Sequence, residues 1–382
     1  MSDFVAAATA LLPRLLEGAA DVERDRRVPK ELAQDLAEAG FYRMLVPRSL
    51  GGGEVRPVEL IDALEVLGRG CGATAWTVMT GATTGLLSAY LPEVGAEPLF
   101  GDPQGIYAGV FAPLGRAKPV EGGYRLTGQW PFMSGVDNAT VRLGGGLVIG
   151  EDGKPRRLAS GEPELRSFFF GAADSQIIDT WHTAGLCGTG SHDVAVSDVF
   201  VPAEHTACVF VDRPAHDGVL YAFPLFGVLA LGVASVGLGI ARAAVDEATR
   251  LARNKRSGRR TLAESELVQV RLAGAEGELR AALALLRATA DQAWTDTATT
   301  KQITDATRAS VRLASTHAAR AAKRVVDTAY HLGGGTALYS KSPLQRCLRD
   351  VNTMTQHIMV AEPTLRPVGR ILLGLETNTS QL

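Results

Sequence analysis

The chain has 382 residues, 46% of them hydrophobic, and a formal net charge of −2. This length exceeds what one hydrophobic core usually serves, so two or three subdomains are expected. The near-neutral charge excludes the broad basic surface that gathers nucleic acid. Four scattered cysteines without CxxC spacing argue against a metal site or a disulfide framework and favour free thiols in the cytoplasm. The N-terminus also lacks the basic stretch of a secretory signal.

Residues 1–104 are predicted to form an N-terminal helical domain. Residues 30–39 carry apolar side chains on one face and stop at Gly40, a common residue at a helix end. Pro57 opens a second helix, whose apolar residues at 58–67 recur at helical spacing. The apolar segment 74–90 is a third helix, ended by Pro92.

Residues 105–213 are predicted to form a central small β-barrel domain. Glycine and proline separate short apolar runs at 124–127, 147–149, 168–170 and 193–196, which is typical of strands. Glu121, Gly122 and Gly123 predict a hairpin turn.

Residues 214–382 are predicted to form a C-terminal four-helix bundle, which makes the fold class α+β. Helices are expected at 225–256, 304–332 and 344–360, with a further one marked by an apolar stripe from Leu272 to Leu286. Residues 219–241 carry no charge and could span a bilayer by length. A buried central helix is favoured over a membrane segment, because helices that are apolar all round also occur in large cores.

Three consecutive glycines, Gly333, Gly334 and Gly335, interrupt sequence that is otherwise helical. Glycine costs helix stability, so such a break usually serves a turn or the close approach of another group. Arg349, Asp350 and His357 follow on what is expected to be the next helix. A helix-turn-helix corner with a solvated charge pair is the alternative.

This segment resembles the C-terminal flavin-binding turn of the acyl-CoA dehydrogenase superfamily. Residues 126–135 (LTGQWPFMSG) are similar to the strand beside its isoalloxazine ring, and 179–193 with 198–202 resemble a strand pair that closes its central domain. The resemblance implies an acyl-CoA dehydrogenase-like fold and a homotetramer assembled through the bundle. It also implies that Gly333, Gly334 and Gly335 receive the flavin tail, often from a neighbouring subunit.

Within this family frame, Trp130, Phe132, Met133 and Ser134 are the implied contacts of the flavin ring, and the Ser134 hydroxyl can donate toward the N5 edge. Without the frame, such a Trp and Ser on a strand would more often be core and turn. From the basic cluster at 253–260, Arg253 is the candidate ligand of the flavin phosphate. His192 is a turn residue or a contact of the flavin or substrate.

The carboxylate base of the dehydrogenases is missing. Ile358 occupies the position a few residues past the Arg-Asp pair, and residues 224–232, the other place used for this base, contain no acid. An apolar residue cannot abstract a proton. His357, beside Ile358, instead resembles the flavin-dependent monooxygenase branch. With an ordinary pKa of about 6.5, a histidine can accept a proton near neutrality. A core histidine is the alternative.

That branch implies the oxygenase component of a two-component enzyme. Such a component takes FMNH2 or FADH2 from a separate NAD(P)H flavin reductase and binds O2. It then forms a C4a-hydroperoxide that oxygenates a small aromatic or natural-product substrate. Two alternatives remain: a flavin oxidase or dehydrogenase with a non-standard base, and a non-catalytic flavin-fold assembly protein. The sequence leaves the substrate and the choice between FMN and FAD open.

Overall fold

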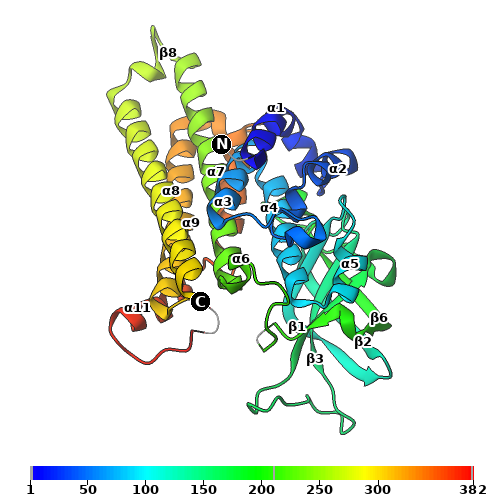
Figure 1. Ribbon diagram of the computed structural model, residues 1–382. Coiled ribbons are helices and arrows are strands. Elements are labelled where there is room, and N and C mark those ends of the chain that lie inside the picture. Colours follow the sequence, from blue (N-terminus) through cyan, green and yellow to red (C-terminus); the bar gives the residue numbers. More distant parts are fainter. Residues whose placement is uncertain (1–2, 210, 380–381) are drawn as a thin grey trace.

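The computed structural model describes residues 3–209, 211–379 and 382, and its elements run as helices, then strands, then helices (Figure 1). The first group contains α1 (Asp3–Arg24), α2 (Lys30–Glu38), α3 (Pro57–Gly70), α4 (Gly72–Leu86) and α5 (Glu93–Phe100). The three helices predicted here are confirmed, although the third ends in a separate 3-10 turn, Leu87–Tyr90. Helix α4 is buried almost throughout because it packs against both β1 and α7.

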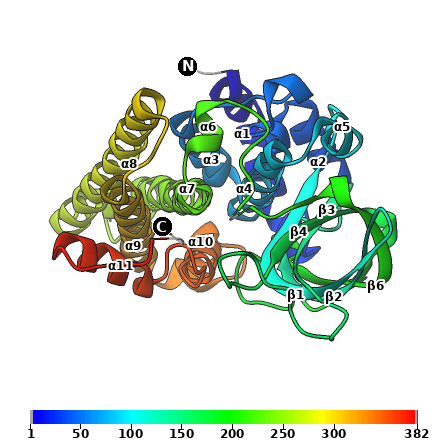
Figure 2. The same cartoon turned by 60° about the horizontal axis from the view of Figure 1, so that its bottom comes forward.

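A seven-stranded sheet follows, in the order β5-β6-β2-β1-β3-β4-β7. Its strands are β1 (Tyr107–Val120), β2 (Gly123–Met133), β3 (Val141–Val148), β4 (Leu165–Gly171), β5 (Gln176–Ile178), β6 (His192–Pro202) and β7 (Thr206–Ala207). The predicted hairpin joins β1 to β2, and Gly122 takes the left-handed φ of +75° that this turn requires. The sheet curls round an apolar core (Figure 2), but β5 and β7 form its two edges, so the predicted barrel is open.

The C-terminal part is a helical bundle. It contains α6 (Val219–Ala222), α7 (Leu225–Asn254), α8 (Glu266–Thr300), α9 (Asp305–Gly333), α10 (Pro343–Met354) and α11 (Leu365–Leu372), with a small hairpin of β8 (Arg256–Ser257) and β9 (Arg260–Thr261) between α7 and α8. Helix α7 contacts α3, α4, α8, α9 and α10 and is the centre of the bundle. A Cβ atom on Gly239 would lie 2.4 Å from the Glu65 carbonyl, so this glycine permits the close approach of α3.

The predicted burial of the uncharged segment is confirmed. Within the described part of the chain, α7 is long and apolar enough to cross a membrane, but 89% of its apolar window is buried inside the protein. Its position at the centre of the bundle accounts for its composition. The fold class is likewise confirmed, while the boundaries after residues 104 and 213 stay a prediction.

Two predicted elements are wrong. The helix expected over 344–360 ends at Met354, so His357 lies in the turn after α10. Near this end the hydroxyls of Thr353 and Thr355 bond to the backbone carbonyls of Arg349 and Asn352, a local pattern that competes with helix geometry. Residues 179–191 form a loop with one 3-10 turn rather than a strand.

Candidate active site

A cavity of about 680 Å³ lies where the N-terminal helices, the sheet and the bundle meet. This size falls within the range of about 300–1,000 Å³ that is usual for small-molecule sites. Most of the lining is apolar or aromatic, with hydroxyls, one glutamine and one histidine among it. The lining includes Trp76, Phe111, Phe132, Ser134, Trp181, Thr183, Thr189, Ser191, Phe226, Leu229, Gln356, His357 and Ile358.

Ser134 and Phe132 reach this cavity from the end of β2. Phe132 has a left-handed φ of +65°, which is rare for a bulky residue, and the pairing of β2 with β6 shifts register between Trp130 and Met133. This bulge turns the Phe132 side chain outward, where it is 68% exposed and lies edge-on to Trp181 at 6.1 Å between ring centroids. The residues present here therefore fit a flat ring, because aromatic walls stand beside a hydroxyl group.

Trp130 and Met133, also predicted as flavin contacts, do not line the cavity. Both are fully buried in the core of the sheet, and the Trp130 indole donates a hydrogen bond of 2.7 Å to the Gly145 carbonyl. The prediction for these two residues is corrected: their side chains support the strand from inside the core and do not line the cavity.

Trp76, on the buried helix α4, is a cavity residue that the sequence analysis missed. Its indole N–H donates to Oγ of Ser134 across 3.0 Å. Its ring also meets the ring of His357 edge-on, with 5.4 Å between centroids and an interplanar angle of 75°. One tryptophan therefore contacts both residues predicted to be catalytic, which come from the sheet and the bundle.

His357 enters the cavity from the turn that follows α10. Burial, assisted by the nearby Arg312 guanidinium, lowers the pKa of His357 from 6.5 to about 4. Its Nδ1 accepts the Met359 amide at 3.3 Å, so the neutral ring carries its proton on Nε2. The expectation of a histidine that titrates near neutrality is corrected: the low dielectric around it favours the uncharged form.

Arg349 and Asp350 do not form the solvated charge pair of the alternative interpretation. The Asp350 carboxylate is buried and accepts the Leu186 amide at 2.6 Å, while Arg349 binds the Ala184 carbonyl and the Glu23 carboxylate. Burial raises the pKa of Asp350 to about 6, although the Leu186 amide opposes this shift. Together the two residues fasten the 179–191 loop to α10.

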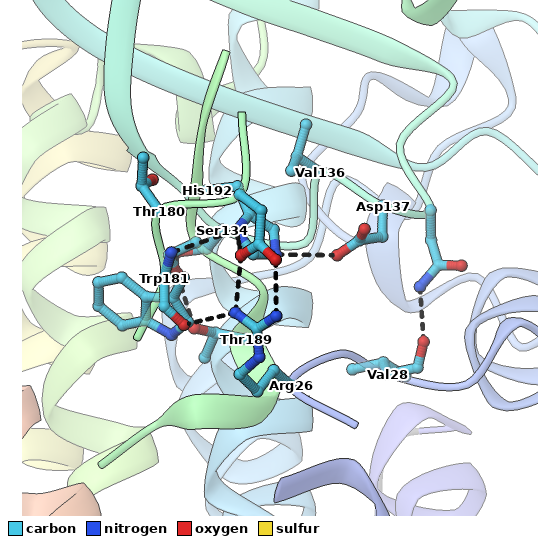
Figure 3. A network of polar contacts seen from close by, with 12 residues as sticks. Arg26, Val28, Ser134, Val136, Asp137, Thr180, Trp181, Thr189 and His192 are labelled. Carbon is cyan, nitrogen blue, oxygen red and sulfur yellow. Dashed lines mark hydrogen bonds and ion pairs between the residues drawn. The ribbon is translucent and has the colours of Figure 1, made fainter. Parts of the chain in front are cut away.

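His192 also contacts the 179–191 loop, through Trp181 (Figure 3). Its Nδ1 lies 3.3 Å from both the Trp181 amide and the Asp179 carboxylate, and Arg26 binds that carboxylate through two contacts of 2.7 Å. The Arg26 guanidinium lowers the pKa of Asp179 to about 2. His192 is buried outside the lining of the cavity, so its predicted contact with substrate is corrected to a structural role.

The glycine turn lies at the opposite end of α10 from His357, and this helix of 12 residues spans about 18 Å. Gly333 is buried, Gly334 has a φ of +52°, and a Cβ atom on Gly335 would meet nothing within 4 Å. The cation at this turn is Lys255, whose Nζ donates to the Gly333 carbonyl and to Thr336. Arg253 is exposed on the last turn of α7, and no contact between described residues links it to these glycines.

The cavity offers no carboxylate base among its described lining residues, and His357 is the only titratable side chain there. Ile358 is exposed at the position where a dehydrogenase would place its acid. Nowhere in the described ranges do three or more His, Cys, Asp or Glu residues gather as metal ligands would.

Comparisons with known proteins agree with this fold. The family model for the acyl-CoA dehydrogenase N-terminal domain matches residues 3–98, and that for the C-terminal domain matches residues 231–362. Indole-3-acetate monooxygenase of Pseudomonas putida is 32% identical, covering 94% of this chain and 92% of its own. The oxygenase component of the FADH2-dependent resorcinol hydroxylase of Rhizobium sp. is 30% identical, covering 94% of this chain and 91% of its own. The crystal structure of 3-HSA hydroxylase from Rhodococcus sp. RHA1 superposes with a TM-score of 0.90 at 26% identity, covering 100% and 99% of the two chains.

The fold and these relatives together place the chain among flavoprotein oxidoreductases. The chain belongs to the acyl-CoA dehydrogenase superfamily, in its branch of flavin-dependent monooxygenases. It is an oxygenase component that uses reduced flavin and O2.

Proposed function

We propose that the enzyme oxygenates a small aromatic compound with a polar substituent, using reduced flavin delivered by a separate NAD(P)H-dependent reductase. The composition of the cavity is the observation that carries this proposal. Phe111, from β1, and Phe226, from α7, meet at 6.4 Å between ring centroids and, with Leu229, give the cavity apolar walls suited to an aromatic ring. Relatives named for indole-3-acetate and resorcinol support the same substrate class.

Ser134 and His357 have separate proposed roles in the cavity. Ser134 binds the polar edge of the flavin ring, and Phe132 with Trp181 forms a wall beside it. His357 presents Nε2–H toward the substrate side, where it holds a developing negative charge on oxygen. The bound flavin supplies the electrons that activate O2. The apolar walls exclude water, which limits the loss of reduced oxygen as free peroxide.

The enzyme is further proposed to act as a homotetramer in the cytoplasm. Apolar side chains stand exposed next to the glycine turn, as Leu338 and Tyr339 do, and at the start of α8, as Leu267 and Val270 do. Exposed apolar groups of this kind favour an interface between subunits. Gly335, open in the single chain, would then face the flavin tail bound by a neighbouring subunit.

Labelled oxygen tests the proposed reaction. The protein, a flavin reductase, NADH and either FMN or FAD are supplied with a panel of indoles and phenols under 18O2. One labelled oxygen atom in a product, formed only when the reductase is present, is the expected result. Bleaching of bound FAD by an acyl-CoA, with no labelled product from any member of the panel, would contradict the proposal.

A further inference from the structure

Three buried hydroxyl groups form a chain along the wall of the cavity, beginning at Ser134. Oγ of Ser134 lies 2.7 Å from Oγ of Ser191, which lies 2.6 Å from Oγ1 of Thr189. Oγ1 of Thr189 lies 2.8 Å from the Leu186 carbonyl oxygen. The three side chains are only 5%, 3% and 1% exposed, respectively, so solvent cannot readily replace any of these contacts.

The two ends of this chain fix the direction of every hydrogen bond in it. A carbonyl oxygen can only accept, so the Thr189 proton points to Leu186, whose carbonyl also accepts the Trp181 indole at 3.0 Å. Ser191 must then donate to Thr189, and Ser134 must donate to Ser191. In the reverse direction the Thr189 hydroxyl and the Leu186 carbonyl would face each other without a proton, which is repulsive.

The other end of the chain agrees with this direction. The indole N–H of Trp76 can only donate, and it points at Oγ of Ser134. Ser134 therefore uses its one proton on Ser191 and one lone pair on Trp76. A single lone pair remains for whatever occupies the cavity, so Ser134 meets a ligand as an acceptor and not as the donor that the sequence motif predicts.

We infer that Ser191 and Thr189 are positioning residues that make the site selective for reduced over oxidised flavin. This inference rests on the proposed function, which places the polar edge of the flavin at Ser134. Reduced flavin carries N5–H, a donor that matches the free lone pair of Ser134, whereas oxidised flavin presents N5 as a bare acceptor. Two acceptors facing each other in a buried site repel, so the oxidised form loses affinity.

Thr189→Val and Thr189→Ser form the matched pair that tests this inference. Valine keeps the shape of threonine but removes the hydroxyl, so Ser191 can turn its proton to Ser134 and the Ser134 proton becomes free for N5. Serine keeps the hydroxyl and the direction. The dissociation constants of oxidised and reduced flavin are measured anaerobically for each variant, together with the midpoint potential of the bound flavin.

The ratio of oxidised to reduced dissociation constants is expected to fall about tenfold in Thr189→Val and to stay at the wild-type value in Thr189→Ser. For a two-electron couple this change lowers the bound midpoint potential by about 30 mV. Ser191→Ala, which removes the acceptor directly, is expected to act in the same direction and provides the test if Thr189→Val does not fold. Ser88→Ala, which removes a buried helical hydroxyl outside the cavity lining, controls for the loss of a buried hydrogen bond.

Unchanged ratios in both Thr189→Val and Ser191→Ala, in protein that still prefers reduced flavin, would overturn the inference while leaving the proposed function intact. Failure of the wild-type protein to bind either flavin would instead overturn the proposed function. Ser134→Ala tests where the flavin lies. If this variant leaves the ratio of oxidised to reduced dissociation constants unchanged, the polar edge of the flavin does not lie at Ser134 and the inference is wrong.

Discussion

The ring of Trp76 lies edge-on to the ring of His357, with 5.4 Å between their centroids, while its indole N–H donates to Ser134. The helix that carries Trp76 is fixed between the sheet and the central helix of the bundle. A buried tryptophan in this position sets the separation between the hydroxyl from the sheet and the imidazole from the bundle. It therefore links the proposed flavin side of the cavity to the proposed substrate side.

The substitution Trp76→Phe should raise the release of free peroxide relative to product. The smaller ring would keep an aromatic contact with His357, but the Ser134 hydroxyl would lose the Trp76 donor and be held by Ser191 alone. The loss of one buried hydrogen bond should cost about 1 kcal/mol of stability. The measurement is the fraction of NADH recovered as peroxide and as product. Unchanged coupling in a folded variant would show that Ser134 does not depend on Trp76.

His357→Ala should reduce product formation about a hundredfold or more, because the cavity then lacks the Nε2–H donor that holds the developing negative charge on the substrate oxygen. Flavin affinity should stay close to that of the wild type, since His357 is placed on the substrate side. Single-turnover product yield and flavin titration together test this expectation. Intact coupling with only a lower melting temperature would reassign His357 as a core residue and leave Ser134 as the remaining candidate.

The pH dependence of stability should reveal the depressed pKa of His357. Its folded-state pKa of about 4 lies below the ordinary 6.5, so the unfolded chain binds more protons between these values. The contribution of His357 to the free energy of unfolding is therefore complete above pH 6.5 and is lost as pH falls toward 4. This pKa shift corresponds to a change in the free energy of unfolding on the order of 3 kcal/mol.

Comparison with His357→Gln isolates this effect. Asp350 titrates in the opposite sense, because its folded-state pKa is raised to about 6 and its contribution is lost as pH rises, but both proteins share that contribution. Urea unfolding between pH 7.5 and 4.5 should show the wild type losing stability relative to the variant. A constant difference across this range would mean that His357 titrates normally.

Gly335→Val should weaken flavin binding if a second subunit completes the site. Gly335 has open space around it and no positive φ, so valine should leave the folding of one chain unchanged. Gly334→Val is a poorer probe, because the φ of +52° there strains any side chain. Sedimentation and flavin titration are measured together. Wild-type affinity in Gly335→Val, or a monomer that binds flavin normally, would refute the role of the turn in assembly.

The sequence predicted the helices and the hairpin because spacing and turn chemistry are local signals. It also brought Ser134 and His357 to one cavity, through the family motifs. It misplaced Trp130 and Met133 because the family motif does not show which side chains of the strand face the core. Trp130 follows the alternation of β2 into the core, and the bulge at Phe132, where a left-handed residue shifts the register, turns Met133 inward as well.

Trp76 was missed for a different physical reason. Helix α4 is apolar on nearly every side, so no periodic stripe shows which face meets a cavity. Thr189 and Ser191 lie in a loop whose course is set by the distant Asp350, a contact between residues far apart in the chain. The lowered pKa of His357 likewise depends on burial that only the assembled domains create.

Anaerobic titration with FADH2 and FMNH2, each compared with its oxidised form, tests the central claim most directly. The purified protein should bind one reduced flavin at least tenfold more tightly than the oxidised form, a margin of about 1.4 kcal/mol that one matched buried hydrogen bond can supply. Mixing that complex with O2 should produce a transient absorbance distinct from both free forms. Tight binding of oxidised FAD, bleached by an acyl-CoA and without any oxygen-dependent transient, would contradict the account.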